Sequence, residues 1–295
     1  MDQTLIFLGL MLIGTFFLGF NDIQKKKYLI QGINEQVLLG LHLFLGGLIL
    51  LPLVLIFGLP KIQAGFWPAA AGTIVLNIVS QAMFMRAFNL SEASMIAPLR
   101  LIIPPLVIIT GFLFLNEVPS LTGIIGIFIT MAGLWFLLSS KNPFSLAEIK
   151  KIKNEKGILL GLLGSILFAI SFPLDKKAVI TSSALFSSSL IFMAIGLITI
   201  LINQLFDRGF GRRMMRIIKT QPVPLLSTAL FLGVGAFLTN QAFNYSLAAY
   251  ASSLKRLQAL WTVVLSGKFL QEEGIKRKLL ATIIMFLGIL LSVLW

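Results

Sequence analysis

The chain of 295 residues contains no cysteine and a single histidine, His42. The missing cysteine excludes disulfides, thiolate metal ligands and thiol nucleophiles. One histidine without a cluster of acidic residues predicts no metal site, and no cofactor is expected. Charged residues are also scarce, at 12% of the chain, whereas 57% of the residues are hydrophobic. A soluble protein of this length cannot bury so large an apolar fraction. The mean hydropathy of +0.96 therefore indicates an all-α polytopic membrane protein.

The chain also lacks the motifs of the common catalytic sites. No Walker A sequence is present, so ATP hydrolysis is not expected to drive the protein. No Glu-x-x-His or Gly-x-Ser-x-Gly pattern occurs, so we expect no enzyme and assign no catalytic residue. The net charge of +13, from 24 basic and 11 acidic residues, lies in short gaps between apolar runs. Such gaps lack a stacking platform for nucleic acid, so the expected partners are a small-molecule substrate and the lipid bilayer, with no nucleic acid.

Ten apolar runs are long enough to cross a bilayer core of about 30 Å as helices. The first run lacks a basic segment before it and a cleavage site after it, which predicts a retained helix and no signal peptide. A polar break predicts a first five-helix repeat at 1–140, a basic linker at 141–156 and a second repeat at 157–295. The runs are Thr4–Phe20, Val37–Phe57, Phe66–Phe88, Met95–Leu115, Leu121–Leu138, Ile158–Leu174, Leu185–Phe206, Pro224–Leu247, Tyr250–Leu270 and Leu279–Trp295.

The break itself contains a helix signal. Ser145-Leu146-Ala147-Glu148 has the spacing of a capping box, in which serine and glutamate satisfy free amides at a helix start. The basic segment Ile149–Lys153 follows it. These residues fit either a short helix at the membrane surface or a solvated linker.

The two halves repeat one design with a shift of 155 residues. Leu115-Asn116-Glu117 falls on Leu270-Gln271-Glu272, and Arg100 falls on Lys255. In each copy the basic residue stands seventeen positions before the glutamate. Because five is odd, the second half must cross the membrane in the opposite sense. This predicts ten transmembrane helices in two inverted five-helix repeats, with a substrate site near the midplane between them.

Several segments carry a resemblance to a known family. Each half contains a small residue and a serine, then an apolar run, then Leu-x-Glu, at Ala93–Glu117 and Ala251–Glu272. The fifth and tenth runs carry glycines at Gly123, Gly126, Gly133 and Gly288. In these features the chain resembles the drug/metabolite transporter superfamily in its ten-helix, EamA-type branch. The resemblance implies a transporter without fixing the substrate, since that family carries amino acids, sugars, nucleotides, drugs and phosphorylated metabolites.

Two positions depart from the family pattern. His42 stands where many members place an arginine in the second span, and Trp261 stands near a common proline of the ninth. Both departures affect the transfer of substrate specificity from relatives.

Three basic residues are the first candidates for substrate binding. Arg100, Lys255 and Arg256 each lie five or six residues inside an apolar run, about 9 Å below its end at 1.5 Å per residue. Their long side chains fit two interpretations. They reach back to the headgroups, or they face a wet cavity and attract a phosphate or carboxylate. The Lys-Arg pair is similar to the pair that binds phosphate in the sugar-phosphate translocator branch.

Polar stripes and prolines supply the other candidates. Amides that share a helix face must avoid lipid, so the stripes in the third and eighth runs should point inward, either to join helices or to bind substrate. Prolines near Arg100 must bend or open the fourth helix, either for gating or only for packing. The amide candidates are Asn77, Gln81, Asn240, Gln241 and Asn244, the further candidates are His42, Tyr245 and Trp261, and the prolines are Pro98, Pro104 and Pro105.

These patterns predict a secondary transporter that moves a small anionic or zwitterionic metabolite by alternating access, as a monomer in the cell (inner) membrane. A lipid-handling protein such as a flippase is the alternative. Four-helix relatives exchange protons for cationic drugs through a glutamate in the first helix, but Leu5–Phe20 and Gly157–Phe172 contain no ionisable residue. This argues against a proton/drug antiporter and leaves facilitated diffusion, exchange or proton coupling through His42 open.

The distribution of positive residues predicts an orientation. The gaps after the first, fifth, seventh and ninth runs hold most of the lysines and arginines, which places them in the cytoplasm and both termini outside. A topology map should therefore find both termini on the outer face, although many relatives are drawn with theirs inside. Termini on opposite sides of the membrane would contradict the ten-span arrangement.

Overall fold

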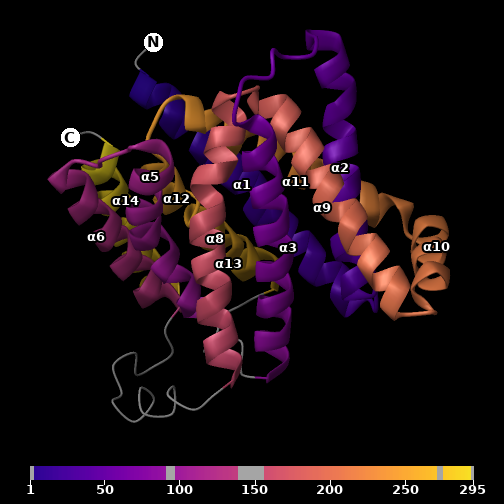
Figure 1. Cartoon of the computed structure of the whole chain (residues 1–295). Coiled ribbons are helices and arrows are strands. Elements are labelled where there is room, and N and C mark those ends of the chain that lie inside the picture. The colour runs from indigo at the N-terminus through magenta and orange to yellow at the C-terminus, as the bar shows by residue number, and fades with distance from the viewer. Residues whose placement is uncertain (1–2, 91–96, 139–155, 271–274, 294–295) are drawn as a thin grey trace. The chain divides into compact units, whose positions relative to one another are not determined.

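The computed structural model describes residues 3–90, 97–138, 156–270 and 275–293, and this part of the chain is all-α (Figure 1). Within it, six helices are long and apolar enough to cross a membrane, and shorter apolar helices cover Leu99–Leu115, Leu121–Phe136 and Ile283–Ser292. The capping-box segment with its basic continuation and Glu272 lie outside the described residues. The long helices are α1 (Gln3–Ile30), α2 (Glu35–Phe57), α3 (Phe66–Leu90), α8 (Lys156–Ile180), α9 (Ala184–Phe206) and α11 (Pro222–Gln241).

The other elements are shorter and follow the same order along the chain. They are the 3-10 helix η1 (Ala97–Ile102), α5 (Ile103–Leu115), α6 (Leu121–Leu138), α10 (Phe210–Thr220), the 3-10 helix η2 (Ala242–Asn244), α12 (Ala248–Leu254), α13 (Leu257–Leu270) and α14 (Ile275–Val293). The fourth and ninth predicted spans are each divided into two pieces. The short basic helix α10, between α9 and α11, was not predicted.

Helix α1 continues well beyond its apolar run. Its last turns contain Asp22 and Lys25, whose side chains form an ion pair of 2.7 Å one turn apart. These polar residues are compatible with a helix that extends out of the hydrocarbon into the headgroup region. The helix stops before Gly32, which has a positive φ of 86° and donates its amide to the Leu29 carbonyl.

The second helix of each half begins with a side-chain cap. The Asn34 side chain accepts a hydrogen bond from the amide of Val37 at 3.1 Å at the start of α2. Ser183 accepts from the amide of Phe186 at 3.1 Å at the start of α9. Each cap satisfies a backbone donor that the helix itself leaves free.

The helices pack into two units, and each unit takes helices from both halves of the sequence. Helices α3 and α8 contribute to both units. Unit 1 consists of Met1–Ile74, Asp175–Tyr245 and Leu257–Gln271, and unit 2 consists of Val75–Leu174, Ser246–Arg256 and Glu272–Trp295.

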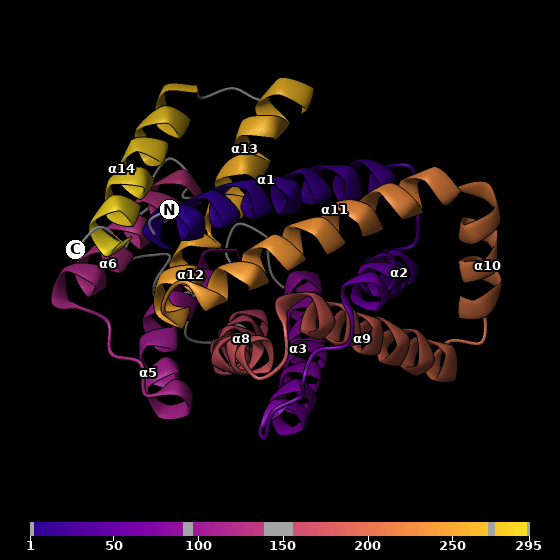
Figure 2. The same cartoon turned by 90° about the horizontal axis from the view of Figure 1, so that it is seen from above.

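In unit 1, the second helix of the first half packs on the second helix of the other half. Along α2, Gly40 lies against Ile200, and Gly47 lies against Ser189. The Ser189 hydroxyl also donates to the Gly47 carbonyl at 2.8 Å. Residue numbers rise along α2 as they fall along α9, so the two helices are antiparallel. They lie side by side in Figure 1 and Figure 2. The glycines allow the backbones to approach closely, as small residues do between membrane helices.

In unit 2, the fifth helices of the two halves form the corresponding pair. A Cβ atom at Gly126 of α6 would lie 2.5 Å from the Gly288 carbonyl of α14, and one at Gly133 would lie 2.7 Å from the Met285 side chain. The numbering again runs in opposite directions, so α6 and α14 are antiparallel. Helices that occupy equivalent places in the two halves thus pack on each other in opposite senses.

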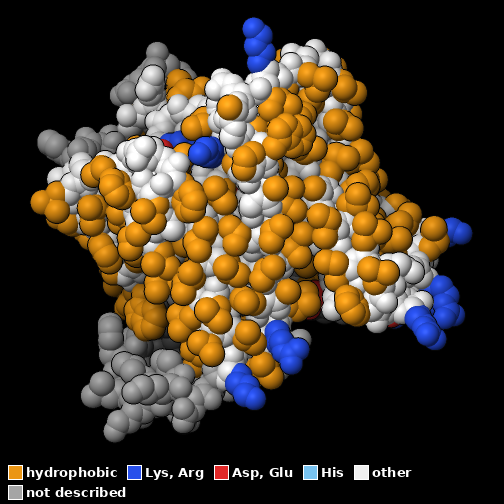
Figure 3. Space-filling model, in the orientation of Figure 1, with side chains coloured by type: hydrophobic (Ala, Val, Ile, Leu, Met, Phe, Trp, Pro, Cys, Tyr) orange, Lys and Arg blue, Asp and Glu red, His pale blue; other side chains and the backbone are white. Residues whose placement is uncertain are grey.

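Much of the exterior is hydrocarbon. Hydrophobic side chains cover most of the face drawn in Figure 3, and basic side chains gather at its edges. Large apolar side chains at the end of α2 are strongly exposed, including Phe57 at 79%. Such a surface is costly in water and favourable against lipid chains.

The glycine contact between α6 and α14 can be tested directly. Gly126→Ala should lower the stability of the folded protein by about 1–3 kcal/mol, because its methyl group would meet backbone atoms that cannot move away easily. The measurement is the unfolding temperature of the detergent-purified protein. Gly9→Ala is the control, since nothing lies within 4 Å of the added methyl group. Equal unfolding temperatures for the two variants would contradict the close packing.

Candidate functional site

The fourth span is interrupted where its prolines and arginine occur. Residues Ala97–Ile102 form the 3-10 helix η1, which contains Arg100, and α5 begins immediately after it. Pro104 and Pro105 lie in the first turn of α5, where a missing amide costs least. The fourth span thus changes from 3-10 to α-helical geometry next to these prolines. The side chain of Pro98 lies outside the described part of the structure.

The ninth span is interrupted at the matching place without a proline. Helix α12 ends at Leu254 and α13 begins at Leu257, so Lys255 and Arg256 occupy the junction. The amide of Arg256 donates to the Ser253 carbonyl at 3.0 Å, three residues back, which is the tighter 3-10 pattern. Both predicted basic positions thus stand at breaks in a helix.

All three basic residues belong to unit 2, where two of them contact aromatic rings. The Arg100 guanidinium lies 4.3 Å from the ring centre of Phe84 in α3, and the Lys255 ammonium lies 5.4 Å from that of Phe172 in α8. These ring faces attract the cations and offset part of the cost of removing them from bulk water. Arg256 is close enough to Arg100 for their charges to repel each other, and its Nε donates to the Ser252 carbonyl at 3.3 Å.

The exposures of these residues differ. Arg100 is exposed, whereas Lys255 and Arg256 are half-buried. Close by in the chain, the Ser253 hydroxyl is buried without a hydrogen-bond partner. Arg100, Lys255 and Arg256 of unit 2, here called the cationic site, carry hydrogen-bond donors of the kind from which phosphates and carboxylates accept.

The amide stripe of α3 joins helices within unit 2. Asn77 donates from its side-chain amide to the Ser171 hydroxyl of α8 at 2.6 Å, and the Ser80 hydroxyl donates to the Gly164 carbonyl at 2.7 Å. Gln81, one turn after Asn77, is half-buried. Interhelical bonding is therefore one observed role of this stripe.

The amides of the eighth span belong to unit 1 and make similar contacts. Asn240 donates to the Ser188 hydroxyl of α9 at 2.9 Å. Asn244 is exposed and donates to the Gln241 carbonyl at 3.3 Å, while Tyr245 is half-buried. The α11 helix ends here in η2, so these residues lie at a helix end and not along a continuous helical face.

Trp261 also belongs to unit 1, where it contacts the first helix. Its indole nitrogen donates to the Thr15 hydroxyl at 3.3 Å, and its ring meets Phe16 edge-on at 5.5 Å. Gly19 faces the Cβ atom of Trp261. Trp261 therefore has a packing role between α1 and α13.

His42 lines a partly open cavity of about 560 Å³ in unit 1. Its Nδ1 lies 2.8 Å from the Leu38 carbonyl, which can only accept, so Nδ1 carries the proton in this contact. Asp22 accepts from Gln258 at 2.6 Å in addition to its ion pair with Lys25. The lining residues are Asp22, Lys25, Leu29, Glu35, Leu38, Leu39 and His42.

Glu117 takes part in connecting the helices of unit 2. Its carboxylate accepts a hydrogen bond from the Ala248 amide at 2.7 Å, at the start of α12. Asn116 before it has a left-handed backbone with φ of 54° and ends α5. The glutamate of the first half thus caps a helix of the second half.

Sequence reasoning missed several partners of the candidate residues. Phe84 and Phe172 are two of 25 phenylalanines, and no local pattern distinguishes them from the others. Glu35 was missed because it stands at a helix start, where acidic residues are common. Among the described residues no group of three histidine, aspartate or glutamate side chains is placed to hold a metal ion.

Comparison with known proteins agrees with this architecture. A solved crystal structure of another protein matches 99% of this chain and 96% of its own, with a TM-score of 0.73 and 13% identity, a level that concerns the fold alone. No curated protein matches the sequence. The model of the EamA-like transporter family matches residues 5–139 and again residues 155–294. Those two matches cover nearly all of the sequence, and the chain therefore belongs to the EamA-like transporter family, whose members are multi-pass membrane transporters and not enzymes.

Proposed function

We propose that the protein is a secondary transporter for a small anionic or zwitterionic metabolite. The observation that carries this proposal is the cationic site of unit 2, in which the charges of Arg100 and Arg256 act on each other beside Lys255. Like charges held together inside a membrane protein destabilise it, and a bound anion removes that repulsion. A group of cations that repel one another is therefore expected where an anion binds between them.

The positions of the cations support the same reading. Arg100 comes from the first half of the sequence, and the Lys255-Arg256 pair comes from the second half. Each stands where a membrane helix is interrupted, and interrupted helices place backbone groups at substrate sites in many transporters. The aromatic faces of Phe84 and Phe172 lie against the side chains of Arg100 and Lys255.

We further propose ten membrane-crossing helices arranged as two inverted repeats, divided at the predicted boundaries, that alternate in opening to the two sides. Support comes from the antiparallel pairing of equivalent helices, α2 with α9 and α6 with α14. Repeats that crossed the membrane in the same sense would pair such helices in parallel. We also propose that the transporter acts as a monomer in the cell (inner) membrane.

The amides and aromatic residues of the predicted site remain proposed substrate contacts. Asn77 and Asn240 have hydroxyl partners on other helices, so substrate would have to share or replace these bonds. The helix opening at Pro104 and Pro105 is proposed to serve gating. His42 is proposed as a substrate contact, since it lines a cavity of suitable size for a small molecule.

The double variant Lys255→Ala/Arg256→Ala tests the cationic site. It should weaken substrate binding about 100- to 10,000-fold, since each of the two charge-assisted hydrogen bonds removed contributes about 1.5–3 kcal/mol. The substrate is first identified by a thermal-shift screen of metabolites on purified protein, because a ligand raises the stability of the state it binds. Affinity is then measured on both proteins.

The matched control is Lys61→Ala/Arg86→Ala, which removes the same charge from exposed positions. Unchanged affinity in a folded Lys255→Ala/Arg256→Ala protein would assign these residues to contacts with headgroups. Uptake in proteoliposomes separates the main alternative, because lipid scrambling without solute flux would favour a flippase.

A further inference from the structure

The helix α10 is a basic amphipathic segment that connects two membrane-crossing helices. It follows α9 directly and leads into α11, so its ends are fixed at the ends of two apolar helices. Its sequence, Phe-Gly-Arg-Arg-Met-Met-Arg-Ile-Ile-Lys-Thr, alternates apolar and basic residues with the period of a helix. Helices of this composition lie in the plane of a membrane interface.

One face of α10 is firmly packed inside unit 1. Phe210 is fully buried and Ile217 is 7% exposed, both in a cluster with residues of α2 and α11. Val37 and Leu225 belong to that cluster, and Met214 packs against it. The burial of these residues fixes the rotation of α10, and therefore fixes which of its side chains point outward.

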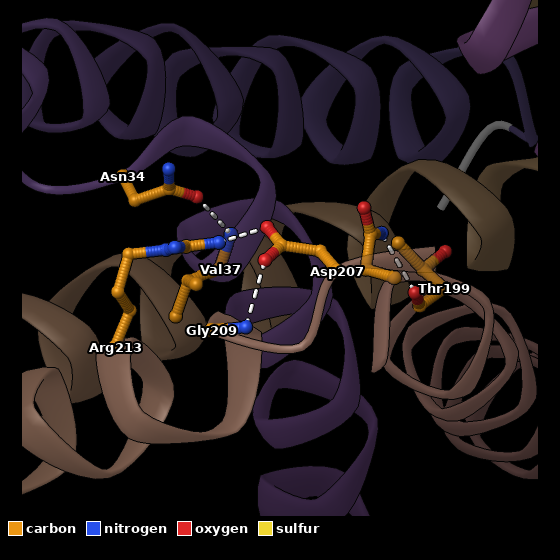
Figure 4. Close-up of polar contacts among 7 residues, drawn as sticks. Asn34, Val37, Thr199, Asp207, Gly209 and Arg213 are labelled. Carbon is orange, nitrogen blue, oxygen red and sulfur yellow. Dashed lines mark hydrogen bonds and ion pairs between the residues drawn. The ribbon is translucent and has the colours of Figure 1, made fainter. Parts of the chain in front are cut away.

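The turn before α10 is held by Asp207. Its carboxylate accepts from the Gly209 amide at 2.9 Å and forms an ion pair with Arg213 (Figure 4). Its own amide donates to the Asn203 carbonyl at 2.9 Å. The guanidinium of Arg213 therefore pairs with a carboxylate of the protein itself.

Four other cations of this region remain on the surface. Arg208, Arg212, Arg216 and Lys219 are exposed, and basic side chains gather over α10 at the lower right of Figure 3.

The surroundings of these cations are apolar. Leu205 and Phe206 at the end of α9 are 81% and 88% exposed, and Val223 at the start of α11 is 71% exposed. Met215 and Ile218 of α10 itself are also exposed. A surface that alternates cations with large apolar side chains fits neither bulk water nor the hydrocarbon interior. It fits the boundary between phosphate headgroups and acyl chains.

We propose that α10 is a binding surface for anionic phospholipids, with their headgroups on Arg208, Arg212, Arg216 and Lys219. The flanking apolar side chains contact the acyl chains of the same lipids, which a free phosphate ion lacks. This inference requires only that α9 and α11 cross the membrane, and it is independent of the substrate proposed above. The attraction between the cations of α10 and the anionic headgroups would hold the α9–α11 connection at a fixed depth in the membrane.

The test compares the full-length protein with Arg212→Gln/Arg216→Gln in nanodiscs of phosphatidylcholine with increasing phosphatidylglycerol. Wild-type protein should retain phosphatidylglycerol and unfold at a higher temperature as its fraction rises. Each cation near a charged surface contributes roughly a fivefold gain, so the double variant should bind anionic lipid about 30-fold more weakly. Native mass spectrometry of retained lipids gives the affinity, and salt should weaken it.

Three controls make the result decisive. Lys61→Gln/Arg86→Gln removes the same charge at exposed positions outside α10 and should keep most of the lipid preference. Arg212→Lys/Arg216→Lys preserves the charges and should bind nearly as wild type, which covers the case that the glutamine variant fails to fold. Inorganic phosphate in pure phosphatidylcholine should give no stabilisation.

Two outcomes would overturn the proposal. One is an equal loss of lipid preference in the α10 variant and in the control outside α10. The other is equal stabilisation of the wild-type protein by inorganic phosphate.

Discussion

A charge or backbone group that enters the hydrocarbon must find a partner in the protein or in trapped water, and the interrupted spans depend on this constraint. Arg100 lies in the 3-10 helix η1, and the amide of Arg256 bonds to the carbonyl three residues back, which is also a 3-10 contact. Aromatic rings of α3 and α8 receive two of the cations. The cations and the helix breaks coincide, so the places that are hardest to accommodate in a membrane are also the places suited to an anion.

Other helices pack on one another through close contacts at glycines, which involve no charged side chains. Glycines between α2 and α9, and between α6 and α14, bring backbones close enough that an added methyl group would collide. Because these pairs join equivalent helices of the two halves, each half depends on the other for its packing. Both units accordingly contain residues from both halves of the sequence.

Much of this architecture follows from hydrophobic patterning. The apolar runs predict the helices well, and Pro104 with Pro105 predicts the break in the fourth span. The break at Lys255 has no such marker, since a 3-10 turn in mid-helix depends on packing and not on a particular residue type. The extension of α1 past Phe20 was missed because the prediction ended with hydrophobicity, whereas the polar residues that follow are able to remain helical.

Side-chain partners were the least predictable feature. The basic run around Arg213 was interpreted only as a topology signal, although its spacing also places Phe210 and Ile217 on one face of a helix. For Phe84 the sequence offers nothing, because its partner Arg100 lies sixteen residues away in a different helical element. Contacts between distant segments depend on how helices pack, and a single sequence carries little information about that packing.

The central claim is that Arg100, Lys255 and Arg256 create a wet, positively charged site within the membrane protein. The natural absence of cysteine allows a direct measurement, the rate at which Lys255→Cys reacts with anionic and cationic thiosulfonate reagents of similar size. The account predicts that the anionic reagent reacts about tenfold faster or more, since a cationic site concentrates anions. Ile109→Cys, at a position 57% exposed on an apolar face, should react with neither. A Lys255→Cys protein that is unreactive, or that reacts equally with both reagents, would contradict the account.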